Sequence, residues 1–343
     1  MKTDKVSTPK SIFNLECVLG NSSLKKLVKN GPNLICESDA INGIKALNPS
    51  LVLLANNHIL DYGTKGLDNT INLLEKRDIK YTGIIDNINA HVNVSYFEKD
   101  GIKVGIYNLC ENEFSVATKS RKGTNGLYDA KNYIDIMNAK KSCNYLIVIY
   151  HGGKEFYRYP SPRLQSVCHN FIDCGADFVI TQHSHAIGCE EVYFGKKIIY
   201  GQGNFIFDCK NDEYWNSEMI VELEVNKNGI NSTNIFINTQ EHQLITDDTL
   251  KESYNNRSNK ITEPGFIEEE YNKFSASMLN NYMARLNKKN IIKKIMNKLT
   301  GGKYYERRYN LSDYVAILNY LECEAHRELL IEGIKNKIHE LEK

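Results

Sequence analysis

Three segments of the chain place histidine directly after an apolar run, where an α/β layer carries its chemistry. An imidazole nitrogen is the commonest protein ligand for first-row divalent metals, and an Asn carboxamide oxygen can hold a hard ion. A further imidazole beside the ions can give a proton to a leaving group. The three segments are Leu51–Leu54 followed by Asn57-His58, Tyr145–Tyr150 followed by His151, and Asp177–Thr181 followed by His183 and His185.

Each segment taken alone allows a simpler interpretation. Asn-His after a strand is also typical of a capped turn, and a strand-end histidine is often a hydrogen-bonded structural residue. The occurrence of three such segments in one chain favours metal binding or catalysis. His183 and His185 are two residues apart, so in an extended segment they point to opposite sides and could serve two neighbouring ions.

These segments, with two more, resemble the bacterial capsule synthesis protein CapA family, which belongs to the calcineurin-like metallophosphatase superfamily. The resemblance runs from Phe13 to Asp208. It implies an α/β fold, a four-layer sandwich of two mixed sheets flanked by helices. The residues beyond the resemblance predict a helical C-terminal extension. The resemblance also implies a role in making poly-γ-glutamate or a capsular polysaccharide. The matching motifs are Phe13-Asn14-Leu15-Glu16, Ala55–Gly63, His151-Gly152-Gly153-Lys154-Glu155, His183-Ser184-His185 and Tyr200–Phe205.

The resemblance also implies roles for individual residues. Glu16 would bridge two ions, and the remaining ligands would be Asn57, His151, His183 and His185. His58 would be the catalytic imidazole. Asp61 could orient that imidazole or could instead cap the following helix. Glu155 and Asn204 are expected on the substrate side of the site.

The expected chemistry is hydrolysis of a phosphoester, with an amide as a less favoured substrate. Two divalent ions ~3.5–4 Å apart would activate water and clamp a phosphoryl oxygen, and His58 would protonate the leaving oxygen. The mixed nitrogen and oxygen donors suit Mn, Fe or Zn better than Ca or Mg. The expected partner is the capsule polymer or its phosphorylated precursor.

One departure from the family pattern concerns the first strand. Members usually open with an apolar strand ending in Gly-Asp, whose Asp is a metal ligand, whereas residues 1–10 are mostly polar and Asp4 follows no apolar run. We therefore expect this strand to be missing, one ligand to be lost, and at least one ion still to bind. The expectation leaves two functions open: a hydrolase, or a weakly catalytic or non-catalytic polymer-binding member of a synthesis complex.

Composition bears on the class of partner, on the state of the cysteines and on the location of the protein. The 343 residues include 43 Lys and Arg against 42 Asp and Glu, which gives no reason to expect a nucleic-acid partner. The nine cysteines are scattered, without a Cys-x-x-Cys pair, and their spacing favours reduced, buried thiols over disulfides or a zinc–thiolate site. No apolar run reaches ~18 residues and no signal peptide is visible, so a cytoplasmic location is expected.

The expected organisation is a metallophosphatase-like domain over residues 1–243, a polar linker over 244–263 and a helical region over 264–343. Within that region, residues 288–299 predict a basic amphipathic helix, either packed on the domain or lying peripherally on an anionic membrane. Residues 311–341 predict one or two helices, with Ser312 or Asp313 as the N-cap.

Overall fold

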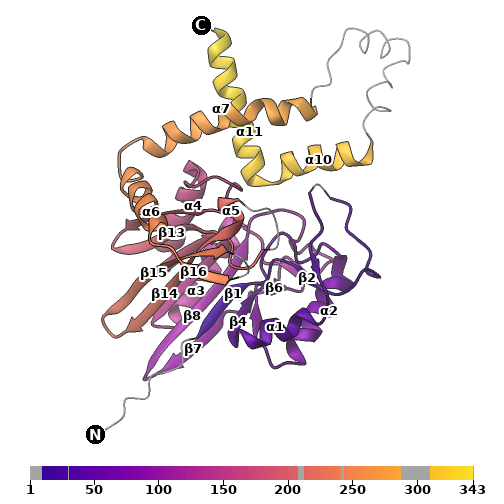
Figure 1. Ribbon diagram of the computed structural model, residues 1–343, viewed down its shortest axis with the longest axis vertical. Coiled ribbons are helices and arrows are strands. Elements are labelled where there is room, and N and C mark those ends of the chain that lie inside the picture. Colours follow the sequence, from indigo (N-terminus) through magenta and orange to yellow (C-terminus); the bar gives the residue numbers. More distant parts are fainter. Residues whose placement is uncertain (1–9, 30, 208–211, 241–242, 287–309, 343) are drawn as a thin grey trace.

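The computed structural model describes residues 10–29, 31–207, 212–240, 243–286 and 310–342. The chain is a mixed α/β protein with several β-sheets and a group of C-terminal helices (Figure 1).

The largest sheet has six strands in the order β12-β13-β11-β10-β8-β7. Its four inner strands are parallel and its two edge strands are antiparallel. The inner strands are apolar runs, as expected of strands covered on both faces. Asp100-Gly101, both with positive φ, turn β7 into β8. The bounds are β7 Ser95–Lys99, β8 Ile102–Cys110, β10 Tyr145–His151, β11 Phe178–Gln182, β12 Ile187–Tyr193 and β13 Lys196–Gln202.

Two helices, α3 (Asp129–Lys141) and α4 (Pro162–Asp173), cover one face of this sheet. The apolar positions of α4 recur at helical spacing and enter the same core as the inner strands. The Ser161 hydroxyl caps α4 by accepting from the Leu164 N–H, and Gly175 follows its end with φ 111°.

The second sheet is parallel and has three strands in the order β1-β4-β5. Helices α1 and α2 pack on its outer face, where their apolar stripes join the side chains of β4. Among the described residues, β1 lies at the edge of this sheet. The bounds are β1 Ser11–Asn14, α1 Ala40–Ala46, β4 Pro49–Leu53, α2 Gly63–Glu75 and β5 Tyr81–Thr82.

The third sheet is an antiparallel meander of β14 (Ser217–Asn226), β15 (Gly229–Gln240) and β16 (Gln243–Thr246). Its inner side chains share one apolar core with β4 and with the remaining face of the six-stranded sheet. The layers are therefore helices, a six-stranded sheet, smaller sheets and helices. The prediction of two mixed sheets needs correction, because the second sheet layer consists of a separate parallel sheet and a separate antiparallel one.

Short elements complete this part of the fold. β2 pairs with β3 and β6 pairs with β9, and a single helical turn, α5, precedes β14. Their bounds are β2 Val18–Leu19, β3 Ile35–Cys36, β6 Ile84–Ile85, β9 Gly123–Thr124 and α5 Glu213–Asn216.

Helices α7, α10 and α11 gather at one end of the molecule (Figure 1). Their bounds are α7 Phe266–Leu286, α10 Leu311–Glu322 and α11 Glu324–Glu342. Residues 311–341 thus form two helices, as expected. The N-cap of α10 is Asn310 and not Ser312 or Asp313, because the Asn310 side chain accepts from the Asp313 N–H while Asp313 reaches back to the Asn310 N–H.

The segment 244–263 is not the polar linker that its composition suggested. It contains the end of β16 and helix α6 (Thr249–Lys260), and Tyr254 of α6 is buried in the core between the sheets. Arg257 donates from its guanidinium to the carbonyl oxygens of Ile187 and Gly188. The polar surface of α6 faces solvent while one aromatic side chain anchors it, a pattern that average polarity conceals. The domain boundaries themselves stay a prediction.

Two further predictions concern membranes. The basic segment 288–299 lies outside the described residues. None of the described helices combines the length and the apolar character that crossing a bilayer requires.

Candidate metal centre

The predicted site residues follow the carboxyl ends of strands from both sheet layers. Asn57 and His58 follow β4, His151 ends β10, and His183 and His185 follow β11. Glu16 follows β1 and is held near the β4 turn by Asn56, whose side-chain amide donates to the Leu15 carbonyl oxygen at 2.9 Å. The carboxyl ends of parallel neighbours meet at one edge of a sheet, and here the two sheets bring these edges together, so that Glu16 and His185 lie close although they are distant in the sequence.

The imidazole of His151 is the centre of this arrangement. Its Nε2 lies 3.1 Å from the Asn57 Oδ1 atom and 3.1 Å from the His183 Nδ1 atom. Its distance to the Glu16 Oε1 atom is 3.8 Å. Two atoms bound to one ion at about 2.1 Å lie roughly 3.0–3.4 Å apart, so these donors have the spacing of a coordination shell.

Burial supports the same interpretation. Glu16 Oε1 is shielded from solvent and has no hydrogen-bond partner among the described residues, which is costly for a carboxylate oxygen unless a cation neutralises it. Burial, together with the nearby His183 and His185, lowers the pKa of His151 well below its usual range, so its imidazole is neutral and able to bind a metal. Glu16, His151 and His183 can together hold a metal ion.

His183 has an unusual backbone and a carboxylate partner. β11 ends at Gln182, and both His183 (φ 85°) and His185 (φ 51°) adopt the left-handed conformation. The expectation of an extended segment is therefore wrong: this left-handed backbone, which costs energy for a residue with a Cβ, orients both imidazoles. The two nevertheless face different groups, since His183 Nε2 lies 3.2 Å from Glu111 Oε1 and His185 Nε2 lies 3.8 Å from Glu16 Oε1.

The Glu111 contact dominates the electrostatics of His183. Burial alone acts to lower the pKa of His183, but the hydrogen bond to Glu111 and the nearby Glu155 and Glu113 raise it to about 10. The ring alone is therefore protonated at neutral pH, and an ion at the other nitrogen would have to displace that proton, while the carboxylate keeps the ring fixed. Here that other nitrogen is Nδ1, the atom that faces His151.

Asn204 positions His185 in the same way. Its Oδ1 lies 2.8 Å from His185 Nδ1, and its side-chain amide donates to the Tyr214 carbonyl oxygen at 2.8 Å. The amide orientation makes His185 Nδ1 the donor, so His185 Nε2 presents its lone pair towards Glu16. Phe156 and Trp215 flank the His185 ring, with centroids 5.9 Å and 4.9 Å away. A role of Asn204 in substrate binding stays a prediction.

His58 belongs to a separate charged group beside these donors. Its Nδ1 lies 2.7 Å from Asp61 Oδ2, and Asp61 Oδ1 forms an ion pair with Lys29 Nζ at 2.7 Å. The side chains of all three are almost fully buried. Asp61 is not the N-cap of α2, which is Tyr62, so the capping alternative is wrong. Its role in orienting a catalytic imidazole stays a prediction. Nδ1 faces Asp61, so Nε2 is the ring nitrogen of His58 that lies outside this contact.

A sequence profile of the family described as "Bacterial capsule synthesis protein PGA_cap" matches residues 9–209. The chain belongs to this family. The predicted ligands, His58, Asp61, Lys29 and Asn204 lie inside the match, whereas Tyr214 and Trp215, which contact Asn204 and His185, lie just beyond it.

Individual relatives agree with the PGA_cap assignment. The chain is 29% identical over 182 residues to the capsule biosynthesis protein CapA of Bacillus anthracis, covering 51% of this chain and 44% of that protein. It is 28% identical over 207 residues to the PGA biosynthesis protein CapA of Bacillus subtilis, covering 57% and 52%. The chain therefore spans about half the length of the curated relatives it matches.

Solved structures overlap with this PGA_cap chain more loosely. A putative 5′-nucleotidase from Staphylococcus aureus aligns with a TM-score of 0.37 at 15% identity, over 60% of this chain and 38% of that one. A 5′-nucleotidase precursor from Thermus thermophilus aligns with a TM-score of 0.38 at 14% identity, over 62% and 43%. The assignment rests on the family match and not on these alignments.

The sequence analysis missed three residues that this PGA_cap chain brings to its centre. Glu111 directly follows the apolar strand β8, which is the same signal that identified His151. Glu113 lies two residues further on. Lys29 lies in an irregular segment with other lysines, so nothing local distinguishes the one whose side chain is buried.

The predicted residue Glu155 does lie near the histidines. Burial acts to raise the pKa of its carboxyl group, but the charges of His183, Lys154 and His185 lower it to about 2. Glu155 is therefore ionised at neutral pH and adds negative charge to the centre. Its role in binding substrate stays a prediction.

Proposed function

We propose that this PGA_cap protein is a metal-dependent phosphoesterase-like hydrolase that acts in the biosynthesis of a capsule or of poly-γ-glutamate. One observation carries the proposal: Asn57 Oδ1 and His183 Nδ1 each lie 3.1 Å from His151 Nε2, beside a buried oxygen of Glu16 that has no hydrogen-bond partner among the described residues. Packing alone gives no reason to gather such atoms. The helix–sheet–sheet–helix layering supports the finer proposal of a metallophosphatase-like sandwich.

The donors suit two divalent ions. Asn57, His151 and His183 would hold one, His185 would hold the other, and Glu16 would bridge them, since its Oε1 is 3.8 Å from both His151 Nε2 and His185 Nε2. The nitrogen and oxygen set suits Mn, Fe or Zn. When bound, such ions supply water activation and stabilise the negative charge of a phosphoryl group.

His58 would act as the general acid. Asp61 accepts from Nδ1 and is itself paired with Lys29, so the imidazole ring is fixed and Nε2 is the atom that can deliver a proton to a leaving oxygen. Such a positioned acid typically contributes ~10²–10⁴ in rate. The proposed substrate is a phosphoester, the phosphorylated precursor of the polymer, with an amide as the less favoured choice.

A second function, polymer binding without efficient catalysis, is favoured by one feature. Among the described residues, the charged neighbour of His185 Nε2 is Glu16. His151 Nε2, by contrast, has donor atoms of both Asn57 and His183 beside it. An ion at His185 would therefore bind more weakly, and the protein would then serve a synthesis complex as a binding module. Peripheral membrane contact through residues 288–299 also remains a proposal.

The test measures metal content and hydrolysis together. The purified chain is loaded with manganese, analysed for bound metal, and assayed on generic phosphomonoesters and phosphodiesters. We expect bound manganese and hydrolysis in the wild type. His151→Ala should lose the hydrolysis and the manganese held by this centre. His91→Ala, a change at a side chain that is 95% exposed, is the control and should change neither. Bound metal without hydrolysis would favour the proposal of a polymer-binding module. Absence of bound metal would contradict both the proposed metal centre and the proposed hydrolase activity.

A further inference from the structure

The C-terminal helices bring a second set of donor atoms to the protein core. Cys323 is the residue between α10 and α11, and His326 lies in the first turn of α11. Both face Glu113, which belongs to the loop after β8. Cys323 and His326 fall outside residues 9–209, so they are not part of the family match.

The three side chains have the geometry of a metal site. A carboxylate oxygen of Glu113, the Cys323 Sγ atom and a ring nitrogen of His326 all lie within 4.8 Å of one another. Cys323 is 2% exposed, so its thiol is enclosed. Small movements of three side chains would bring such donors to the distances at which zinc is bound, about 2.0–2.3 Å.

Glu113 gives independent support for a cation. Its Oε1 accepts a hydrogen bond from the side-chain amide of Asn319 at 2.9 Å, which fixes the carboxylate from α10. Its Oε2 is shielded from solvent and has no hydrogen-bond partner among the described residues. A buried, unpaired carboxylate oxygen beside a thiol and an imidazole is costly without a cation.

We propose that Glu113, Cys323 and His326 form a second metal site, for a thiolate-binding divalent ion such as Zn²⁺. One thiolate, one carboxylate and one divalent ion sum to zero charge, which suits a buried position. Binding breaks the S–H bond of Cys323, forms a metal–sulfur bond and releases the proton to solvent, with no change of oxidation state. Three protein ligands leave a fourth position for water or for Glu111, whose Oε1 is 4.0 Å from Cys323 Sγ.

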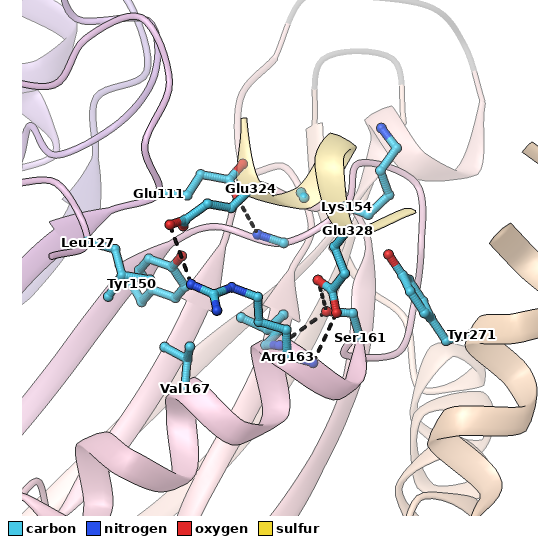
Figure 2. A pocket seen from close by; sticks show the side chains of 13 residues that line it. Glu111, Leu127, Tyr150, Lys154, Ser161, Arg163, Val167, Tyr271, Glu324 and Glu328 are labelled. Carbon is cyan, nitrogen blue, oxygen red and sulfur yellow. Dashed lines mark hydrogen bonds and ion pairs between the residues drawn. The ribbon is translucent and has the colours of Figure 1, made fainter. Parts of the chain in front are cut away.

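The site would fasten the C-terminal helices beside the first centre. Figure 2 shows that α11 already contacts the start of α4 around a cavity: Glu328 accepts from the Ser161 hydroxyl at 2.9 Å and from the Arg163 N–H at 3.1 Å. Glu324 pairs with the Arg163 guanidinium at 3.4 Å. An ion at Cys323 would add a bond between positions 210 residues apart. The inference does not depend on the proposed hydrolase activity.

Cobalt distinguishes this site from the first one. Co²⁺ replaces Zn²⁺ and gives a thiolate charge-transfer absorption in the near ultraviolet when a cysteine binds it, and the first centre contains no sulfur donor. We expect the full chain to show this absorption with one equivalent per chain and to lose it on addition of excess Zn²⁺. His151→Ala should keep it, which separates this result from failure of the proposed function.

The variants identify the thiolate. Cys323→Ser should abolish the absorption. Cys36→Ser should keep it, and it controls for Co²⁺ binding at Cys17 and Cys36, whose sulfur atoms lie 3.3 Å apart. Glu113→Gln retains the thiol and should weaken Co²⁺ binding at least roughly tenfold. If Cys323→Ser does not fold, the Glu113→Gln variant still tests the site. A wild type without the absorption, or unchanged affinity in Glu113→Gln, would overturn the proposal.

Discussion

The two clusters of donor atoms differ in the way that the fold assembles them. The first takes its side chains from strand ends in the sheet layers, and its positions are fixed by backbone ladders and by a core on both faces. The second joins a loop of the core to two helices that dock through side-chain contacts. A centre built on strands is preorganised for chemistry, whereas a centre at a docking surface depends on whether the helices stay in place.

The clusters also differ in donor chemistry. The first uses imidazole, amide and carboxylate groups, although Cys17 is the neighbour of Glu16 in the chain. The second includes a thiol. We therefore expect the two to prefer different ions, and Glu111 lies between them, with its Oε1 at 3.2 Å from His183 Nε2 and 4.0 Å from Cys323 Sγ.

The largest expected effect separates catalysis from metal binding within the first cluster. His58→Ala should lower turnover by ~10²–10⁴ and leave metal content unchanged, because it removes an acid and not a ligand. His183→Ala and Asn57→Ala should lower metal content itself. Turnover is measured with a phosphoester and metal by elemental analysis. Equal metal loss in all three variants would contradict this division of roles.

A smaller effect is expected from the carboxylate between the clusters. Glu111→Gln should weaken metal binding at the first cluster about 10–100-fold, because the partner that orients His183 is lost. The measurement is a metal titration by calorimetry. Glu191→Gln is a matched control, because its carboxylate contacts Gln165, His169 and Tyr200, none of which belongs to either cluster. This variant should leave affinity unchanged. Unchanged affinity in Glu111→Gln would show that the backbone alone orients His183.

Docking of the helices can be weakened without touching a metal ligand. Glu328→Ala removes the acceptor for two donors at the start of α4 and should destabilise the docked helix by about 1–3 kcal/mol. Hydrogen exchange should rise in α11 while the strands of the six-stranded sheet stay protected. Glu340→Ala, at an exposed position of α11, should leave exchange unchanged. Equal protection in both variants would mean that apolar contacts hold α11.

The smallest effect concerns the thiols near the first cluster. Cys17 donates a hydrogen bond to the Cys36 sulfur at 3.3 Å, which lowers the pKa of Cys36 to about 7. A lowered pKa means more thiolate at neutral pH, so alkylation of Cys36 should rise to half its maximum near pH 7. Burial raises the pKa of Cys174, which should react mainly at higher pH. Mass spectrometry of labelled peptides measures both, and equal rates at pH 7 would exclude the thiol pair.

Much of the first cluster followed from the order of residues. Apolar runs ending in His151 or in the segment before His183 identify strands, and parallel strands place their carboxyl ends together whatever the intervening sequence is. The family motifs then supplied Glu16 and Asn57 as candidate ligands. Helix α4 could also be predicted from the sequence, because its signals are local: the apolar spacing, the N-cap Ser161 and the glycine after its end, Gly175.

Only the tertiary structure decided the rest. The sequence could not show which lysine is buried against Asp61, that α6 packs its single aromatic side chain into the core, or that His183 and His185 are left-handed. Nor could it show that Cys323 and His326 meet Glu113. Those contacts depend on how the helices dock on the sheets, and docking is determined by the summed fit of many side chains that are distant in the sequence. Strand ends and helix caps, by contrast, are determined by a few neighbouring residues.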